Sequence, residues 1–166
     1  MPAALSAYAR ELLNSDQEAR KSLDYPVLIC EEPGIGFEDE FFTTETTPKK
    51  KQGSGSPLVF EVKKSPNKTN AFAMGITVGR TGNNDVVLED NSVSRFHAYF
   101  QKDLKTGLWT LMDAESKNGS WIDALRLTSG KSALVSDGCH LRFGEVELLF
   151  LLPESLLDYL EGKLTG

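Results

Sequence analysis

The chain has 166 residues, with 18 Lys and Arg against 24 Asp and Glu, and carries a net charge of −6 at neutral pH. This length suits one domain of ordinary size with an appended segment, and it is enough to bury a core without metal or disulfide staples. The acidic balance argues against general nucleic-acid binding, which draws its affinity from many Lys and Arg contacts to phosphates. A small local basic site remains compatible with it.

The two cysteines, Cys30 and Cys139, belong to no CxxC motif and to no Cys/His cluster with metal-ligand spacing. We therefore expect no metal site, and free thiols in a reducing compartment are favoured over one long-range disulfide. Residues 1–20 have no continuous apolar stretch of the signal-peptide kind. No run approaches the roughly 18 apolar residues that a membrane span needs. A cytoplasmic protein with no membrane or nucleic-acid partner is expected.

The N-terminal third, residues 1–56, is predicted to be an extension of the main domain. Apolar residues at helical spacing predict an amphipathic helix over residues 3–23, which either docks on the domain or binds a partner. The short apolar run 27–30 fits an extra edge strand. A threonine-rich segment and a Gly/Ser-rich linker of flexible composition follow. The candidate phosphoacceptors in this segment are Thr43, Thr44, Thr46 and Thr47.

From about Pro57 the pattern becomes all-β, because short runs of β-branched and aromatic residues alternate with Gly-, Asn- and Asp-rich turns. Many short strands at near-regular spacing predict a sandwich or barrel over residues 57–152. Pro153 and Glu154 then open a short helix, through about Leu160, in a C-terminal tail of residues 153–166. The expected strands are residues 58–62, 71–78, 86–88, 96–101, 108–112, 120–122, 126–127, 141–143 and 145–152.

Three short polar clusters stand at the ends of these apolar runs. They are Gly79-Arg80, the Ser-Arg-Phe-His sequence at 94–97 and the Ser-Lys-Asn-Gly sequence at 116–119. Together they supply two guanidinium groups, a hydroxyl and a carboxamide. Such donors suit a phosphate dianion with three acceptor oxygens, and they are a poor set for breaking a bond.

In this order and spacing, the clusters resemble the forkhead-associated (FHA) domain, whose pattern is Gly-Arg, then Ser-x-x-His, then Asn-Gly. The resemblance covers roughly residues 58–152 and is to a small bacterial-type FHA protein. It implies an FHA-type β-sandwich of about eleven strands whose loops at one end bind phosphothreonine peptides. The implied function is a signalling adaptor module, with no catalysis and no cofactor. The implied partner is a phosphothreonine-containing protein, such as a Ser/Thr kinase or its substrate.

The resemblance also implies a role for each polar residue. Phosphopeptide binding falls to Arg80, Ser94, Arg95, Lys117 and Asn118, and loop organisation to Gly79, His97 and Gly119. Arginine offers a planar fork of donors that is never neutral, and Asn118 offers both a donor and an acceptor to a peptide backbone.

The sequence departs from the family pattern at Lys117, because the residue before the Asn is usually Thr or Ser. This puts discrimination between phosphothreonine and phosphoserine in question. The positions that shape specificity for the third residue beyond the phosphothreonine include Ser92 and Ser120. Neither is basic, so no strong acidic preference is expected there.

Three alternatives stay open beside this interpretation. One is a structural or oligomerising module that uses the same fold without phosphate. Another is a hydrolase built from Ser94, His97 and Asp113, which is disfavoured because no Gly-x-Ser-x-Gly nucleophile elbow is present. The third concerns residues 43–47. They are either an unmodified linker or, as in some small bacterial family members, a kinase target that folds back on the binding site.

Overall fold

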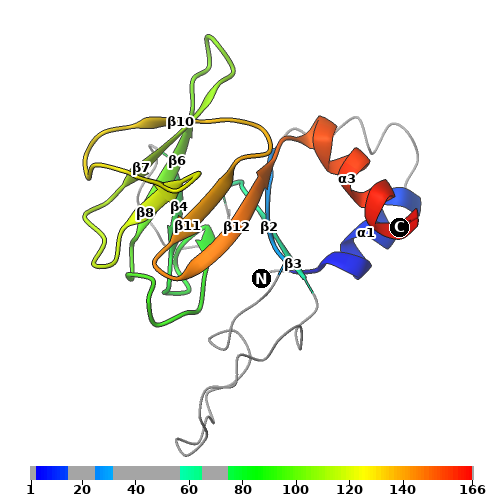
Figure 1. The fold of residues 1–166 in the computed structure, drawn as a ribbon, viewed down its shortest axis with the longest axis horizontal. Coiled ribbons are helices and arrows are strands. Elements are labelled where there is room, and N and C mark those ends of the chain that lie inside the picture. The colour runs from blue at the N-terminus through cyan, green and yellow to red at the C-terminus, as the bar shows by residue number, and fades with distance from the viewer. Residues whose placement is uncertain (1–2, 15–24, 32–56, 65–74, 166) are drawn as a thin grey trace, which may run out of the picture.

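The computed structural model describes residues 3–14, 25–31, 57–64 and 75–165, which form two β-sheets with two helices outside one of them (Figure 1). Seven strands make the first sheet, in the order β1-β3-β2-β12-β11-β8-β9, and five make the second, in the order β10-β7-β6-β4-β5. The all-β prediction is confirmed, with twelve strands in the described residues where about eleven were expected. The elements are β1 (Ala3–Ala4), α1 (Leu5–Asn14), β2 (Val27–Cys30), β3 (Leu58–Glu61), β4 (Ile76–Gly79), β5 (Val86–Val87), β6 (Ala98–Lys102), β7 (Trp109–Asp113), β8 (Ser120–Ile122), β9 (Leu125–Arg126), β10 (Ala133–Val135), β11 (His140–Phe143), β12 (Val146–Leu151) and α3 (Pro153–Thr165).

The main core lies between the two sheets. Side chains alternate between core and solvent along β6, β7 and β11, as expected when each sheet buries one face. Phe100 from the second sheet contacts Phe143 and Phe150 from the first, with ring centroids 6.5 Å and 5.8 Å apart. Such aromatic contacts add to the burial of apolar area that holds the sheets together.

Strand β2 is an interior strand and not the edge strand that the sequence suggested. It pairs with β12 on one side and with β3 on the other, and all four of its residues are buried. Leu28 and Cys30 join the core between the sheets, whereas Val27 and Ile29 join a second apolar cluster on the outer face. A strand covered on both faces reads as a continuous apolar run, which by itself does not give its place in the sheet.

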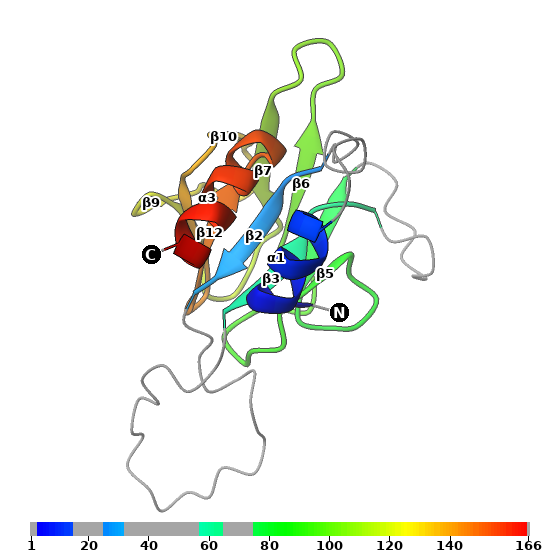
Figure 2. The ribbon, with the colours of Figure 1, turned by 90° about the vertical axis from the view of Figure 1, so that its right-hand side faces the viewer.

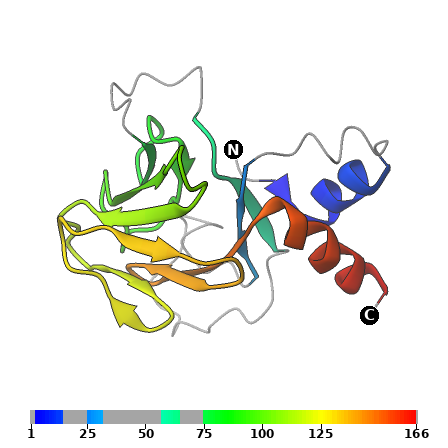
Figure 3. The same ribbon diagram turned by 90° about the horizontal axis from the view of Figure 1, so that it is seen from above.

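The second apolar cluster is formed by the two helices and the outer face of the first sheet. Figures 2 and 3 show α1 and α3 side by side over β2, β3 and β12. Leu5 and Ala9 of α1, with Leu156 and Leu160 of α3, are buried there. The described part of the N-terminal helix therefore docks on its own sheet. None of the described helices has the length and apolar character to cross a membrane.

Several predictions near the N-terminus change in detail. Ala3 and Ala4 pair with β3 as β1, so the helix begins at Leu5, and residues 15–24 lie outside the described residues. The Thr43–Thr47 cluster and the Gly/Ser linker also lie outside them. The division of the chain at residues 56/57 stays a prediction, although β2 from the predicted extension is a full member of the first sheet.

Besides β1, strand β10 was not predicted from the sequence. It pairs with the edge of β7, and Leu134 at its centre is 61% exposed. Its short sequence lacks the apolar–polar alternation that marks a half-buried strand, so periodicity gave no signal.

The connections that follow β4, β5, β7 and β11 meet at one end of the sandwich. The amide of Arg80 donates to the Ser94 carbonyl oxygen at 2.9 Å, and the amide of Gly144 donates to the Gly119 carbonyl oxygen at 3.0 Å. The amide of Glu145 donates to the hydroxyl of Ser92 at 2.8 Å. This end of the sandwich is therefore where the three polar clusters come together.

Candidate functional site

The first cluster places Arg80 directly after β4, with most of its donors uncommitted. The Arg80 Nε donates to the Val93 carbonyl oxygen at 3.0 Å, which orients the guanidinium. Both terminal NH₂ groups, which carry four of the five guanidinium donors, make no hydrogen bond or ion pair with the described residues. Arg80 is half-buried, so its charge is held at the surface rather than lost in the core.

Gly79 permits this placement because the chain passes very close to the second cluster. A Cβ at Gly79 would overlap the Arg95 carbonyl oxygen and would lie 2.6 Å from Asn84 Nδ2. Asn84, which is buried, donates from that Nδ2 to the same Arg95 oxygen at 2.7 Å and to the Thr81 carbonyl at 3.0 Å. Asn84 is an organising residue that the sequence analysis missed, since its partner Arg95 lies in another loop.

The second cluster is fixed from below by His97, which is fully buried. Its Nδ1 accepts from the Ser94 amide at 3.0 Å, and its Nε2 lies 2.8 Å from the Gly119 carbonyl oxygen. Burial lowers the pKa of His97 below its ordinary value of 6.5, although the Gly119 carbonyl and the Asp113 carboxylate act in the opposite direction. These two contacts join the loop of the second cluster to that of the third.

Ser94 and Arg95 face the solvent above this histidine. The Ser94 Oγ accepts from the Lys117 amide at 2.9 Å, which leaves the hydroxyl proton available for a further acceptor. The Arg95 side chain is exposed, while its backbone carbonyl is held by Asn84 and Thr81. The second and third clusters are thus joined by a direct bond.

The third cluster presents Asn118 on a turn with Gly119 in the left-handed region, at φ 90°. Asn118 Nδ2 donates to the Ser92 carbonyl oxygen at 2.8 Å. This bond orients the side-chain carboxamide, whose Oδ1 takes no part in it. Both Lys117 and Asn118 are exposed. The structure therefore brings together all eight described residues that the sequence analysis selected.

A buried carboxylate supports the third cluster from inside. Asp113, only 5% exposed, accepts from the hydroxyls of Ser120 at 2.6 Å and Ser129 at 2.9 Å, and from the Ser116 amide at 3.0 Å. Burial alone would raise the pKa of Asp113, but these hydrogen bonds outweigh it and hold the pKa below its ordinary value of 3.8. Ser120 is fully buried by this bond, so it cannot contact a bound peptide as the resemblance implied.

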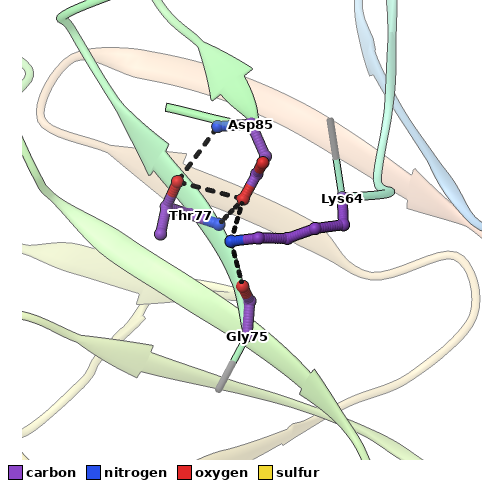
Figure 4. A network of polar contacts seen from close by, with 4 residues as sticks. All are labelled: Lys64, Gly75, Thr77 and Asp85. Carbon is purple, nitrogen blue, oxygen red and sulfur yellow. Dashed lines mark hydrogen bonds and ion pairs between the residues drawn. The ribbon is translucent and has the colours of Figure 1, made fainter. Parts of the chain in front are cut away.

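A second network anchors the far end of the Arg80 loop (Figure 4). Asp85 accepts from the Thr77 amide and from Lys64 Nζ, both at 2.9 Å, and Lys64 also donates to the Gly75 carbonyl at 3.0 Å. The Asp85 side chain is fully buried in this pair. Because a buried charge is stable only when paired and hydrogen-bonded, the network fixes the start of β5 against β4.

The contacts of Ser94, His97 and Asp113 argue against the hydrolase alternative. Ser94 Oγ is bonded to the Lys117 amide and not to His97, whose ring binds the Ser94 backbone. The Asp113 carboxylate is bonded by serine hydroxyls rather than by the imidazole. A nucleophile needs its base within hydrogen-bond reach and the base needs an orienting acid, and neither link is present.

Comparison with known proteins places the chain in the family that it resembles. The FHA domain family model matches residues 76–144, the stretch that contains all three clusters. The chain is 33% identical over 101 residues to the glycogen accumulation regulator GarA of Mycolicibacterium smegmatis, a match that covers 59% of this chain and 60% of that protein. It is 31% identical over 101 residues to the oxoglutarate dehydrogenase inhibitor of Corynebacterium efficiens, with 59% and 67% covered. The chain belongs to the FHA domain family.

A solved structure supports the same fold. The complex of Mycobacterium tuberculosis EmbR with a low affinity phosphopeptide superposes with a TM-score of 0.50 at 20% identity. That likeness covers 89% of this chain and 29% of EmbR. The chain matches about 60% of the length of the first relative named above.

Proposed function

We propose that this chain is a non-catalytic module that binds phosphothreonine-containing peptides at the end of its sandwich. The observation that carries the proposal is the convergence of uncommitted donors. The donors are the terminal NH₂ groups of Arg80, the hydroxyl proton of Ser94 and the exposed guanidinium of Arg95. They come from two loops that are joined by the bond from the Arg80 amide to the Ser94 carbonyl oxygen. A phosphomonoester brings close to two negative charges and three acceptor oxygens, which match this set.

Asn118 completes the proposed site beside the phosphate. Its Nδ2 is bonded to the Ser92 carbonyl, so its Oδ1 acts as a fixed acceptor for a backbone N–H of an extended peptide. A peptide held by its phosphate and by its backbone is bound in one direction and one register. This division of labour explains how an acidic protein binds one class of anion without binding nucleic acid in general.

Family membership supports the partner class. EmbR, which shares the fold, is described in complex with a phosphopeptide. Of the two relatives, GarA is named as a regulator and the other as an inhibitor of oxoglutarate dehydrogenase. The proposed partner is accordingly a phosphothreonine-containing protein, either a Ser/Thr kinase or its substrate, in the cytoplasm. Binding then regulates the partner or recruits it.

Calorimetry with a phosphothreonine peptide and its unphosphorylated counterpart tests the proposal. Arg80→Ala should weaken phosphopeptide binding by about 2–5 kcal/mol, because a phosphate oxygen loses its charged partner. Arg10→Ala, which removes an exposed arginine of α1, is the matched control and should leave binding unchanged. Equal binding of the two peptides, or unchanged binding by folded Arg80→Ala protein, would overturn the assignment. Retained binding after phosphatase treatment would favour the oligomerising alternative instead.

Lys117 is proposed to contact the phosphopeptide and to decide between phosphothreonine and phosphoserine. Its amide is bonded to Ser94, so its backbone lies at the phosphate site, while its side chain is exposed. Paired phosphothreonine and phosphoserine peptides should differ less in affinity for the wild type than for Lys117→Thr. The same ratio in both proteins would remove Lys117 from the specificity site.

The threonine cluster at residues 43–47 is proposed as a kinase target that competes for the same site when phosphorylated. The cluster follows β2 in the chain and precedes β3, and Cys30 pairs with Leu58 across the two strands. Protein phosphorylated on this cluster should lose affinity for an external phosphopeptide, and a variant with all four threonines replaced by Ala should not. Full affinity in the phosphorylated protein would rule out this competition.

A further inference from the structure

Three side chains form a row beside the proposed phosphopeptide site. Trp121 on β8 is the cross-strand partner of Arg126 on β9 and of Arg142 on β11. The guanidinium carbon of Arg126 lies 5.3 Å from the centroid of the indole, and that of Arg142 lies 4.2 Å from it. Directly opposed residues on one face of a sheet contact one another, so the indole is flanked by both cations.

The row lies against the Asn118–Gly119 turn. A Cβ built on Gly119 would lie 2.9 Å from Arg126 Nε and 3.0 Å from Trp121 Cη2. On the other side, Arg142 Nε donates to the Gly144 carbonyl oxygen at 2.7 Å, and the Gly144 amide donates to Gly119 at 3.0 Å. The row is thus continuous with the turn that presents Asn118.

The two arginines are exposed and have no acidic partner in the described part of the chain. The ion pairs found there are formed by Lys63 and Lys64. Stacking on Trp121 holds the two guanidinium groups in place, so less side-chain freedom is lost when an anion binds. Two ordered, unpaired cations on an acidic protein are complementary to an anionic partner.

We propose that the Arg126–Trp121–Arg142 row is a second contact surface that binds a carboxylate side chain of the phosphorylated partner. The inference rests on the proposed function, because the row adjoins Asn118 and the bound peptide would leave the phosphate site across it. The partner therefore carries Asp or Glu near its phosphothreonine. This replaces the expectation of no acidic preference, which was drawn from Ser92 and Ser120.

Neither of these serine side chains is placed to select a side chain of the bound peptide. Ser120 is fully buried against Asp113. The Ser92 hydroxyl donates to Asp90 at 2.7 Å and accepts from the Glu145 amide at 2.8 Å. The basic groups that border the turn come from β9 and β11, which are later in the sequence and become neighbours only through sheet pairing.

The test uses the full chain and phosphothreonine peptides in which one Glu is moved through the positions on both sides of the phosphothreonine. Each Glu peptide is paired with the same peptide carrying Gln. At one or two positions the wild type should bind Glu about fivefold more tightly than Gln, the effect of an ordered surface ion pair. Arg126→Gln and Arg142→Gln should abolish this ratio, and Arg10→Gln should retain it.

The outcomes separate this inference from the proposed function. If every peptide binds in an Arg80-dependent manner and Glu gives no gain at any position, the row is not a contact surface. A gain that persists in folded Arg126→Gln and Arg142→Gln proteins overturns it as well. If no phosphopeptide binds at all, the proposed function fails first. Thermal unfolding of each variant checks the fold, and Arg142→Lys, which keeps the charge, should retain part of the gain.

Discussion

His97 Nε2 lies 2.8 Å from the carbonyl oxygen of Gly119, and this bond joins two of the three loops at the site. The same ring accepts the Ser94 amide on Nδ1 at 3.0 Å, and its edge packs on Phe143 with centroids 5.6 Å apart. An amide N–H can only donate, so Nδ1 must be unprotonated and Nε2 must carry the hydrogen. The neutral imidazole is therefore part of the architecture of the site.

Acidification should destabilise the protein through His97. Its pKa in the folded state is below the ordinary 6.5, because burial disfavours the cation. Between the two pKa values the unfolded chain binds more protons than the folded chain, so the free energy of unfolding rises with pH. The contribution of His97 is fully present above about pH 6.5 and falls as the pH drops toward the lower folded pKa. Urea unfolding measured between pH 5 and pH 8 checks this.

The chain has two histidines, so replacing each in turn assigns the pH dependence of stability to one of them. His140 is exposed, so His140→Gln should keep the slope of stability against pH. His97→Gln should remove it and should also lower stability at pH 8. Stability is the better measurement here, because the second ionisation of a phosphopeptide lies near pH 6 and would affect binding in the same range. A slope that disappears in His140→Gln would contradict the role given to His97.

Gly79→Ala should damage both stability and binding. The new methyl group would overlap the Arg95 carbonyl oxygen, which is backbone and cannot turn aside. Overpacking of this kind costs about 1–3 kcal/mol, and here it would also displace Arg80. Gly82→Ala in the same loop meets open space and should be nearly neutral. Equal effects of the two substitutions, measured by thermal unfolding and peptide affinity, would contradict the close approach.

The convergence of the candidate site residues was largely predictable, because these polar residues cluster at the strand ends in the sequence. What could not be predicted is how distant segments support them. Asp113 accepts from the hydroxyls of Ser120 and Ser129, and Asn84 donates to the Arg95 carbonyl oxygen. These contacts depend on loop conformations that no local pattern encodes. The structure adds the scaffold under residues that the sequence had already selected.

The fold was predicted to the level of class and most strand positions, and the order of the strands within each sheet was not. The run Val27–Cys30 indicated a strand, but only the packing of both helices on its outer face explains why all four residues are buried. The Arg126–Trp121–Arg142 row could not be predicted from the sequence for a similar reason. Its members are separated along the chain and become adjacent only when the register of three strands is known.

Asp113→Asn should lower stability by about 2–3 kcal/mol, because charge-assisted hydrogen bonds from several hydroxyls are weakened and an amide NH₂ faces donors. The stabilisation from Asp113 should also depend on pH. Its folded pKa lies below 3.8, so the contribution is present above that value and is lost as the pH falls through the folded pKa. Acid unfolding of the wild type should therefore be steeper below pH 4 than that of the variant. Asp123→Asn, in an exposed turn, is the comparison.

The Lys64–Asp85 pair should contribute measurably to stability, whereas the neighbouring Lys63–Glu61 pair should not. Lys64 Nζ lies 2.9 Å from Asp85, whose side chain is fully buried, while Lys63 Nζ lies 3.5 Å from Glu61 with both side chains partly exposed. Removing one partner of a buried pair leaves a desolvated charge, and exposed pairs contribute little because water screens them.

Double-mutant cycles with Lys64→Met and Asp85→Asn should give a coupling energy of about 1 kcal/mol or more, against less than about 0.5 kcal/mol for Lys63→Met and Glu61→Gln. Because Asp85 also holds Thr77 of β4 beside the start of the Arg80 loop, Asp85→Asn should weaken phosphopeptide binding and Glu61→Gln should not. Similar coupling energies for the two pairs would show that the buried carboxylate does not anchor this loop.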